Sequence, residues 1–205
     1  MPAKQLKFVG VAALLLACSP SPDRRAEPME LRGQVLPEPL ARPDFTLLDT
    51  SERPFDFGLE TRGRLTLLFF GYTYCPDVCP LHMANIAQVL AQMAPSDAAR
   101  VEVVFVTTDP ERDTPQRLRS WLDAFDRRFV GLTGTRAAID SAQLALGIRP
   151  GFRETEGENY SVAHAAVVFA FTADDLAHVV YPFGIRQADW AADLPQLLSG
   201  SWAGH

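Results

Sequence analysis

The stretch LTLLFFGYTYCPDVCP, residues 65 to 80, joins a run of large apolar side chains to two cysteines. The run at 65–70 is short and continuous, which is typical of a central strand that is buried on both faces. Gly71 ends the run, and the cysteine segment follows at once. Apolar side chains then recur at helical spacing over residues 81–93. A buried strand, a cysteine turn and a helix therefore succeed one another.

The alternation of strands and helices continues towards the C-terminal end. Thr114 and Pro115 open a helix, with the threonine as N-cap and the proline in the first turn. Apolar patterns predict further strands over 101–107, 129–132, 165–171 and 179–181, and helices over 135–146 and 187–198. This order predicts the α/β class, with a central mixed sheet flanked by helices.

The N-terminal end has the pattern of an export signal. Two lysines precede a short apolar run over residues 8–17. The run ends in Leu-Leu-Ala-Cys, which resembles the lipobox of bacterial lipoproteins, whose cysteine is acylated. We therefore expect a lipoprotein signal peptide over 1–17, lipidation of Cys18, and an extracytoplasmic protein that is lipid-anchored to the bacterial cell membrane. The alternative is a plain signal peptide or a short anchor.

Residues 18 to 43 have the composition of a tether between a membrane and a folded domain. Six prolines fall among polar and charged residues, at positions 20, 22, 28, 37, 39 and 43. Such a segment favours extended polyproline conformations of about 3.1 Å per residue. Its last part, 31–36, is also compatible with an edge strand. The folded domain is expected over residues 44–200.

The charge balance excludes one class of partner. Removal of the signal peptide takes away both lysines, so 19 − 2 = 17 basic residues, all of them arginine, remain against 25 acidic residues. The net charge of 17 − 25 = −8 argues against nucleic acid as a partner, because binding to phosphates needs a basic surface.

Cys75 and Cys79 are separated by three residues, and each is followed by a proline. A purely structural disulfide would gain little here, since closing so short a loop stabilises a fold by only about 2 kcal/mol. The pair lies between a buried strand and a helix, where α/β folds place their sites. With Cys79 as N-cap and Pro80 next, both sulfurs would lie at a helix N-terminus, which favours thiolates. Redox chemistry and metal binding both use thiolates.

Two thiolates suit copper(I), or zinc with further ligands. If Cys18 is acylated, a third ligand would have to be an imidazole. His164 immediately precedes the strand at 165–171, and it would face the cysteines if that strand runs antiparallel to 65–70. On the residues alone, a structural role for His164 is equally open. The other histidines lie in the helix after the cysteines, in a hairpin and at the last position, at 82, 178 and 205.

Four segments together resemble the SCO/SenC family. They are YCPDVCP at 74–80, DPERDTP at 109–115, FVGLTG at 129–134 and YSVAH at 160–164. The resemblance covers about residues 31–198 and implies a thioredoxin-like fold on a membrane anchor. It also implies a copper ion, Cu(I) or Cu(II), and a role in assembling the dinuclear CuA centre of cytochrome c oxidase. Carried over to this chain, the copper ligands are Cys75, Cys79 and His164.

The same resemblance implies the partners, which are cytochrome c oxidase subunit II and other periplasmic copper chaperones or thiol reductases. It also implies a metallochaperone rather than an enzyme. The family usually has an aspartate just before the histidine, whereas Val162 and Ala163 precede His164 here. We expect Asp109 and Asp113 to be turn and helix-cap residues ahead of the helix.

Two other functions use the same cysteines. A thiol–disulfide oxidoreductase would keep the cysteines of another protein reduced. Typical thioredoxin-like reductases have a two-residue spacer and a proline before the facing strand, whereas this chain has a three-residue spacer and no proline over 152–164. A peroxidase is the third reading, but Pro76 stands where peroxiredoxins carry a threonine, three residues before the reactive cysteine.

The segment at 149–163 immediately precedes His164 in the chain. It is rich in charge, contains two glycines and has no apolar period. We expect few buried contacts and a mobile loop here.

Overall fold

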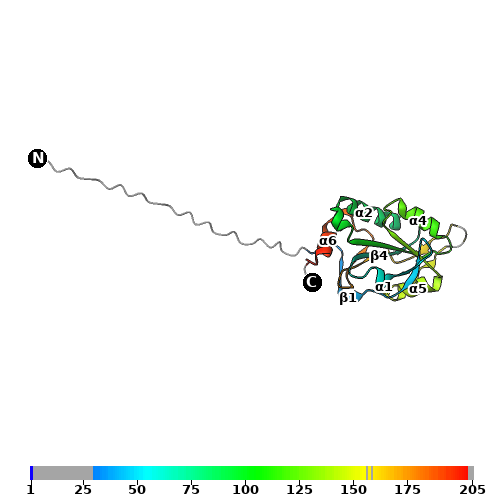
Figure 1. The fold of residues 1–205 in the computed structure, drawn as a ribbon. Coiled ribbons are helices and arrows are strands. Elements are labelled where there is room, and N and C mark those ends of the chain that lie inside the picture. Colours follow the sequence, from blue (N-terminus) through cyan, green and yellow to red (C-terminus); the bar gives the residue numbers. More distant parts are fainter. Residues whose placement is uncertain (2–29, 156, 158, 203–205) are drawn as a thin grey trace.

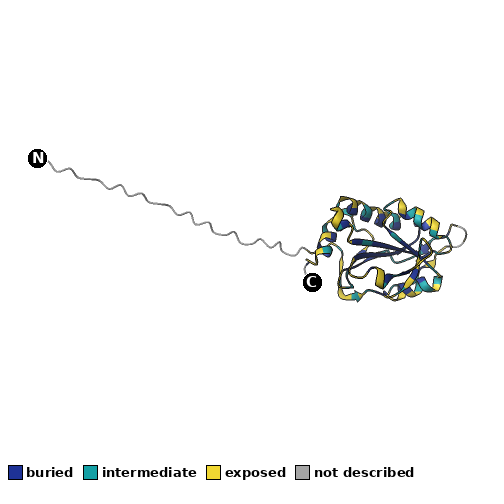
Figure 2. Cartoon of the chain, viewed as in Figure 1, coloured by how far each residue is buried: buried dark blue, intermediate teal, exposed yellow. Residues whose placement is uncertain are grey.

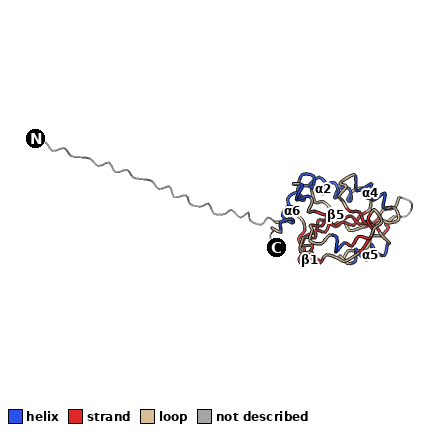
Figure 3. Tube along the Cα trace, in the orientation of Figure 1, coloured by secondary structure: helices blue, strands red, loops and turns tan. Residues whose placement is uncertain are grey.

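The structure is a computed structural model that describes residues 1, 30–155, 157 and 159–202. Within these residues there are ten strands and six helices, and strands and helices alternate over residues 65–144 as the sequence pattern predicts (Figure 3). The strands are β1 (Gln34–Ala41), β2 (Thr46–Asp49), β3 (Pro54–Asp56), β4 (Leu65–Gly71), β5 (Val101–Thr107), β6 (Val130–Thr133), β7 (Phe152–Arg153), β8 (Val162–Ala163), β9 (Val167–Phe171) and β10 (Leu176–Pro182). The helices are α1 (Phe57–Glu60), α2 (Val78–Gln92), α3 (Pro95–Ala98), α4 (Pro115–Asp123), α5 (Arg136–Leu144) and α6 (Gln187–Ser199).

Eight strands form one mixed sheet in the order β1-β10-β9-β4-β5-β6-β2-β3. The central strands β4, β5 and β6 are parallel, and β9 lies antiparallel to β4 on the other side. Helices cover both faces, with α2, α4 and α6 on one and α1 and α5 on the other (Figure 1). The predicted α/β class with a central mixed sheet between helices is confirmed.

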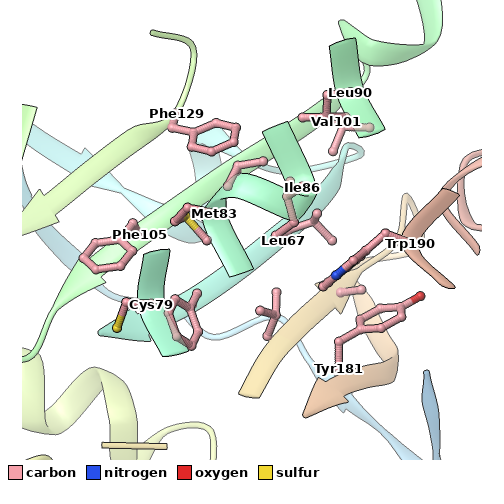
Figure 4. Packing of buried hydrophobic residues seen from close by; sticks show 14 of the residues in the cluster. Leu67, Cys79, Met83, Ile86, Leu90, Val101, Phe105, Phe129, Tyr181 and Trp190 are labelled. Carbon is pink, nitrogen blue, oxygen red and sulfur yellow. The ribbon is translucent and has the colours of Figure 1, made fainter. Parts of the chain in front are cut away.

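Strand β4 is buried along its whole length because both of its faces pack against helices. Leu67 and Phe69 belong to the core under α2 and α6, whereas Leu68 and Phe70 belong to the core on the opposite face. Figure 4 shows the first of these cores, with Met83 of α2 among the side chains that meet β4. Burial is concentrated in the sheet, and exposed residues lie on the outer sides of the helices (Figure 2).

Helix α2 begins earlier than the prolines suggest. Its N-cap is Asp77 rather than Cys79, so Cys79 lies inside the first turn. Pro80 is compatible with this start, because the first N–H groups of a helix have no intrahelical acceptor to lose. Both cysteines still lie at the N-terminal end of the helix, as predicted.

The sheet also begins earlier in the chain than the expected domain boundary at residue 44. Strand β1 pairs antiparallel with β10, with an irregularity between Val35 and Leu40. Pro37 and Pro39 lie in this interval, and proline is tolerated there because β1 is an edge strand. Residues 34–41 therefore belong to the sheet, and the edge strand considered for 31–36 is present from Gln34 onward. Just before them, the backbone N–H groups of Arg32 and Gly33 donate to the Asp193 carboxylate of α6.

The segment at 149–163 contains a short element of regular structure. Strands β7 and β8 pair within it as a short antiparallel hairpin. Gly151, Tyr160 and Val162 are buried, whereas the described residues between 152 and 159 are all exposed, so few buried contacts are found, as expected. Tyr160 and Val162 alternate with exposed or half-buried neighbours, a signal too short to stand out among the surrounding charges.

The expected signal peptide over 1–17, the lipidated Cys18 and most of the tether lie outside the described residues. Among the residues that are described, no helix combines the length and apolar character needed to cross a membrane.

Candidate metal centre

The two cysteines lie in a turn at the end of β4 and the start of α2. The backbone N–H of Cys75 donates to the Tyr72 carbonyl oxygen, which tightens the turn. The N–H of Cys79 points back and lies 3.4 Å from the Cys75 sulfur. Both residues are buried, Cys75 with 8% of its surface exposed and Cys79 with none. Both are free thiols and form no disulfide.

His164 comes from the opposite side of the site. Strand β9 pairs antiparallel with β4, with Val168 opposite Phe69, so the residues just before β9 lie beside the end of β4. The imidazole packs edge-on against Phe69 and Tyr72, with ring centroids 5.9 and 5.6 Å away. Its Nε2 lies 3.5 Å from the Cys79 sulfur. The antiparallel placement predicted for His164 is therefore the one observed.

The ligand atoms of Cys75, Cys79 and His164 all lie within 4.8 Å of one another. Two thiol sulfurs and one imidazole nitrogen form a soft donor set with three positions. Structural zinc sites usually close around four protein ligands, so a three-donor cluster of this kind fits Cu(I) better than zinc. The residues present therefore fit a copper ion.

The orientation of His164 does not depend on a neighbouring carboxylate. Its Nδ1 lies 3.3 Å from the carbonyl oxygen of Ala165. With the proton on Nδ1, His164 donates to this carbonyl and presents the lone pair of Nε2 to the cysteines. The missing aspartate before His164 is thus replaced by a backbone acceptor from the next residue.

The two thiols differ in charge. A hydrogen bond from the Cys79 side chain and backbone N–H groups at the helix start outweigh the effect of burial and lower the pKa of Cys75 to about 3. Burial, followed by the nearby Cys75 sulfur, raises the pKa of Cys79 well above its ordinary value. At neutral pH the pair therefore holds one thiolate on Cys75 and one proton on Cys79.

Asp113 holds the turn that carries Cys75. Its carboxylate is fully buried and accepts from the Thr73 N–H at 2.9 Å, the Thr73 hydroxyl at 2.6 Å and the Thr107 hydroxyl at 2.7 Å. Burial raises the pKa of Asp113, and these hydrogen bonds oppose the rise. The N-cap is Thr114, as predicted, and its hydroxyl accepts from the Arg117 N–H, so the helix-cap role expected of Asp113 is not observed. Asp113 therefore fixes β4 and β5 at the site.

Asp109 links the segment that carries His164 to the same edge of the sheet. The Tyr160 hydroxyl donates to Asp109 at 2.6 Å, and the Arg112 guanidinium donates to the other carboxylate oxygen. The guanidinium also lies over the Tyr160 ring, 3.5 Å from its centroid, and over the Tyr74 ring at 4.6 Å. We call Tyr74, Arg112, Asp109 and Tyr160 the clasp. It connects the residue before Cys75 with a residue four positions before His164.

The remaining histidines have different surroundings. His82 is buried beside the site and packs against Phe69, with ring centroids 5.1 Å apart. Burial lowers the pKa of His82 to about 4, so its ring is neutral at pH 7. His178 lies on β10, with Nε2 2.7 Å from the Asp174 carboxylate, and does not join the cluster. His205 lies outside the described residues.

Comparison with known proteins places this arrangement in a family. The chain is 37% identical over 158 residues to a putative copper-binding protein of Stutzerimonas stutzeri, an alignment that covers 74% of this chain and 76% of the relative. The mammalian mitochondrial SCO1 and SCO2 homologues that the chain also matches are longer, and it spans 50 to 62% of their length.

Solved structures agree with the sequence relatives. The copper-bound ScoI of Bradyrhizobium japonicum has a TM-score of 0.68 and 31% identity, covering 78% of this chain and 99% of that one. The apo Sco1 protein of Thermus thermophilus has a TM-score of 0.73 and 30% identity, covering 83% and 98%. The expected thioredoxin-like fold is confirmed by these neighbours. The SCO1/SenC family model matches residues 34–199, from the first strand of the sheet to the end of α6, and the chain therefore belongs to the SCO1/SenC family.

Proposed function

We propose that this protein is an extracytoplasmic copper-binding metallochaperone that assists assembly of the dinuclear CuA centre of cytochrome c oxidase. The observation that carries the proposal is the convergence of Cys75, Cys79 and His164 within 4.8 Å at one edge of the sheet. Support comes from the copper-binding protein of Stutzerimonas stutzeri and the copper-bound ScoI of Bradyrhizobium japonicum, both more than 30% identical to this chain.

Each ligand has a defined role in this proposal. Cys75 supplies a thiolate that already exists in the apo protein, because its pKa is low. Cys79 gives up its proton when the ion arrives, as metal ligands must. His164 completes the site through Nε2 while Nδ1 donates to the Ala165 carbonyl. A three-donor site of soft ligands holds Cu(I) and leaves a side open to a ligand from the acceptor.

The proposed acceptor is cytochrome c oxidase subunit II, and the proposed donors of copper or electrons are other periplasmic copper chaperones or thiol reductases. Lipidation of Cys18 would hold the domain at the cell membrane. A SCO1/SenC family lipoprotein from Bacillus anthracis, 22% identical to this chain, has the same fold. No nucleic acid is expected to take part.

The decisive experiment is a Cu(I) titration of the purified full-length chain under reducing conditions, with a competing chelator. We expect one copper per chain. Cys75→Ser and Cys79→Ser should abolish tight binding, and His164→Ala should weaken it by at least the roughly 10- to 100-fold that loss of an outer-shell partner costs. His178→Ala is the matched control, because that imidazole bonds to Asp174 instead of joining the cluster. Equal affinity of the wild type and His164→Ala would contradict the proposed ligand set.

A second candidate function is that of a thiol–disulfide oxidoreductase acting on the oxidase subunit or on another copper chaperone. The observation that favours it is the unequal setting of the two thiols: Cys75 is 8% exposed with the Cys79 N–H 3.4 Å from its sulfur, whereas Cys79 is fully buried. This setting lowers the pKa of Cys75 and raises that of Cys79. Oxidoreductases use such a pair, since the thiolate attacks and the second thiol resolves the mixed disulfide. If this is the main role, His164→Ala should retain oxidase assembly in cells, whereas either cysteine variant should lose it.

A further inference from the structure

His82 has a property that a core-filling side chain does not need. Its imidazole is 2% exposed, and its Nε2 has no hydrogen-bond partner among the described residues. A buried polar atom without a partner costs about 1–3 kcal/mol, whereas leucine or phenylalanine would fill the same space without that cost. Packing alone therefore does not explain an imidazole at this position.

The helix places His82 close to the cluster. It follows Cys79 by three residues, and side chains at this spacing share one face of a helix, with Cβ atoms about 5–6 Å apart. Pairs of metal ligands with the same spacing occur in the Glu-x-x-His helices of di-iron proteins. His82 and His164 also pack on the same ring, that of Phe69, with centroids 5.1 and 5.9 Å away. Two imidazoles thus lie beside two sulfurs, although only one of them is within the 4.8 Å cluster.

One of the side chains that contact His82, Phe183, is itself half-exposed. The Phe183 ring approaches His82 with centroids 6.3 Å apart, and Phe183 is 46% exposed. Phe183 follows β10, and its backbone N–H donates to the Ala166 carbonyl. Its half-exposed ring can therefore turn outward without opening the core. Rotation of His82 about its side-chain bonds would then exchange contact with Phe69 for contact with the cluster.

The two oxidation states of copper differ in the number of ligands they favour. Cu(I) is stable with a soft three-donor set, whereas Cu(II) prefers a tetragonal arrangement with additional nitrogen or oxygen ligands. We propose that His82 is the fourth ligand of Cu(II) in this protein, and that Cu(I) leaves it packed on Phe69. This inference rests on the proposed copper function. It makes the site Cys2His for the reduced ion and Cys2His2 for the oxidised ion.

The number of coordinated imidazoles tests the proposal directly. The purified full-length chain, loaded with one equivalent of Cu(II), should show two imidazoles by pulsed electron paramagnetic resonance, which detects the remote ring nitrogen. His82→Leu, which keeps a similar side-chain volume, should show one. His178→Leu should retain two and serves as the matched control. Cu(II) affinity should fall in His82→Leu by at least the roughly 10- to 100-fold that loss of an outer-shell partner costs, whereas Cu(I) affinity should stay within a factor of about two.

The outcomes separate this inference from the proposed function. A single imidazole in the wild type, or two imidazoles in both wild type and His82→Leu, would overturn the role of His82 and leave the copper site standing. Absence of tight binding for both ions would overturn the proposed function itself. If His82→Leu does not fold, as judged by its Cu(I) stoichiometry, the wild-type spectrum of protein labelled with 15N-histidine still decides between one imidazole and two.

Discussion

Gly71→Ala is the sharpest test of the position of Cys79. Gly71 ends β4, and a Cβ built on it would lie 2.6 Å from the Cys79 sulfur, 3.0 Å from Cε1 of Phe69 and 3.1 Å from Cε2 of Phe105. Comfortable contacts between such atoms begin at about 3.5 Å, so the methyl group needs roughly 1 Å more room at the sulfur. All three side chains are fully buried, but the contact with the sulfur is the shortest, so the sulfur has to move furthest.

The consequences of this displacement differ for stability and for copper. Crowding of a packed core costs about 1–3 kcal/mol, which a domain with a stability of about 5–15 kcal/mol survives. Metal ligands, however, must lie within about 0.2 Å of their ideal distance. A shift of roughly 1 Å at Cys79 should therefore reduce Cu(I) affinity by at least tenfold, a loss of about 1.4 kcal/mol in binding free energy.

Gly131→Ala supplies the matched control. A Cβ on Gly131, in β6, would lie 2.7 Å from Cδ1 of Leu122 and 3.0 Å from Cγ of Leu118, away from the cysteines. Both variants should lose stability in urea unfolding, and only Gly71→Ala should lose copper affinity in chelator competition. A folded Gly71→Ala protein that binds Cu(I) as tightly as the wild type would refute the proposed position of Cys79 in the copper site.

Three further predictions follow from the same region. Iodoacetamide should alkylate apo Cys75 at a nearly constant rate from pH 8 to pH 5, because the pKa of Cys75 is about 3. Mass spectrometry identifies the alkylated site. A rate that falls tenfold per pH unit would mean that Cys75 is an ordinary thiol. Asp113→Ala leaves three buried donors without their acceptor. It should therefore lower the free energy of unfolding, measured by urea denaturation, by roughly 3 kcal/mol, and a loss below about 1 kcal/mol would contradict these hydrogen bonds. Cys18→Ser should release the protein from the membrane fraction with its copper binding intact, and continued membrane attachment would exclude lipidation as the anchor.

The position of His164 could be predicted because it depends on strong, local patterns. The runs at 65–70 and 165–171 are apolar enough to be central strands, and antiparallel pairing of the two brings the start of one beside the end of the other. His164, which precedes the strand at 165–171, therefore lies beside the cysteines that follow the strand at 65–70. The match to the SCO/SenC segments led to the same three residues.

The roles of Asp113 and His82 could not be predicted in this way. Asp113 is followed by a threonine and a proline, which favours a turn or a helix cap, but its acceptor role depends on Thr73, 40 residues earlier in the chain. The orientation of the His82 side chain depends on where α2 begins and on its contact with Phe183, which lies in the loop after β10. The expected and observed helix starts differ by two residues, and residues 80–92 are helical in both cases. Which of their side chains are buried is decided by contacts with distant segments.

The clasp has a consequence for the speed of copper transfer. Because Tyr74 and Tyr160 both stack on Arg112, the segments that carry Cys75 and His164 are held by one shared guanidinium. If the ion leaves by withdrawal of His164, the hydrogen bond from Tyr160 to Asp109 has to break first. The opening rate of the clasp would then be the upper limit of the transfer rate, however strongly the acceptor binds copper. A partner could accelerate transfer by contacting half-exposed Tyr74, without touching the metal.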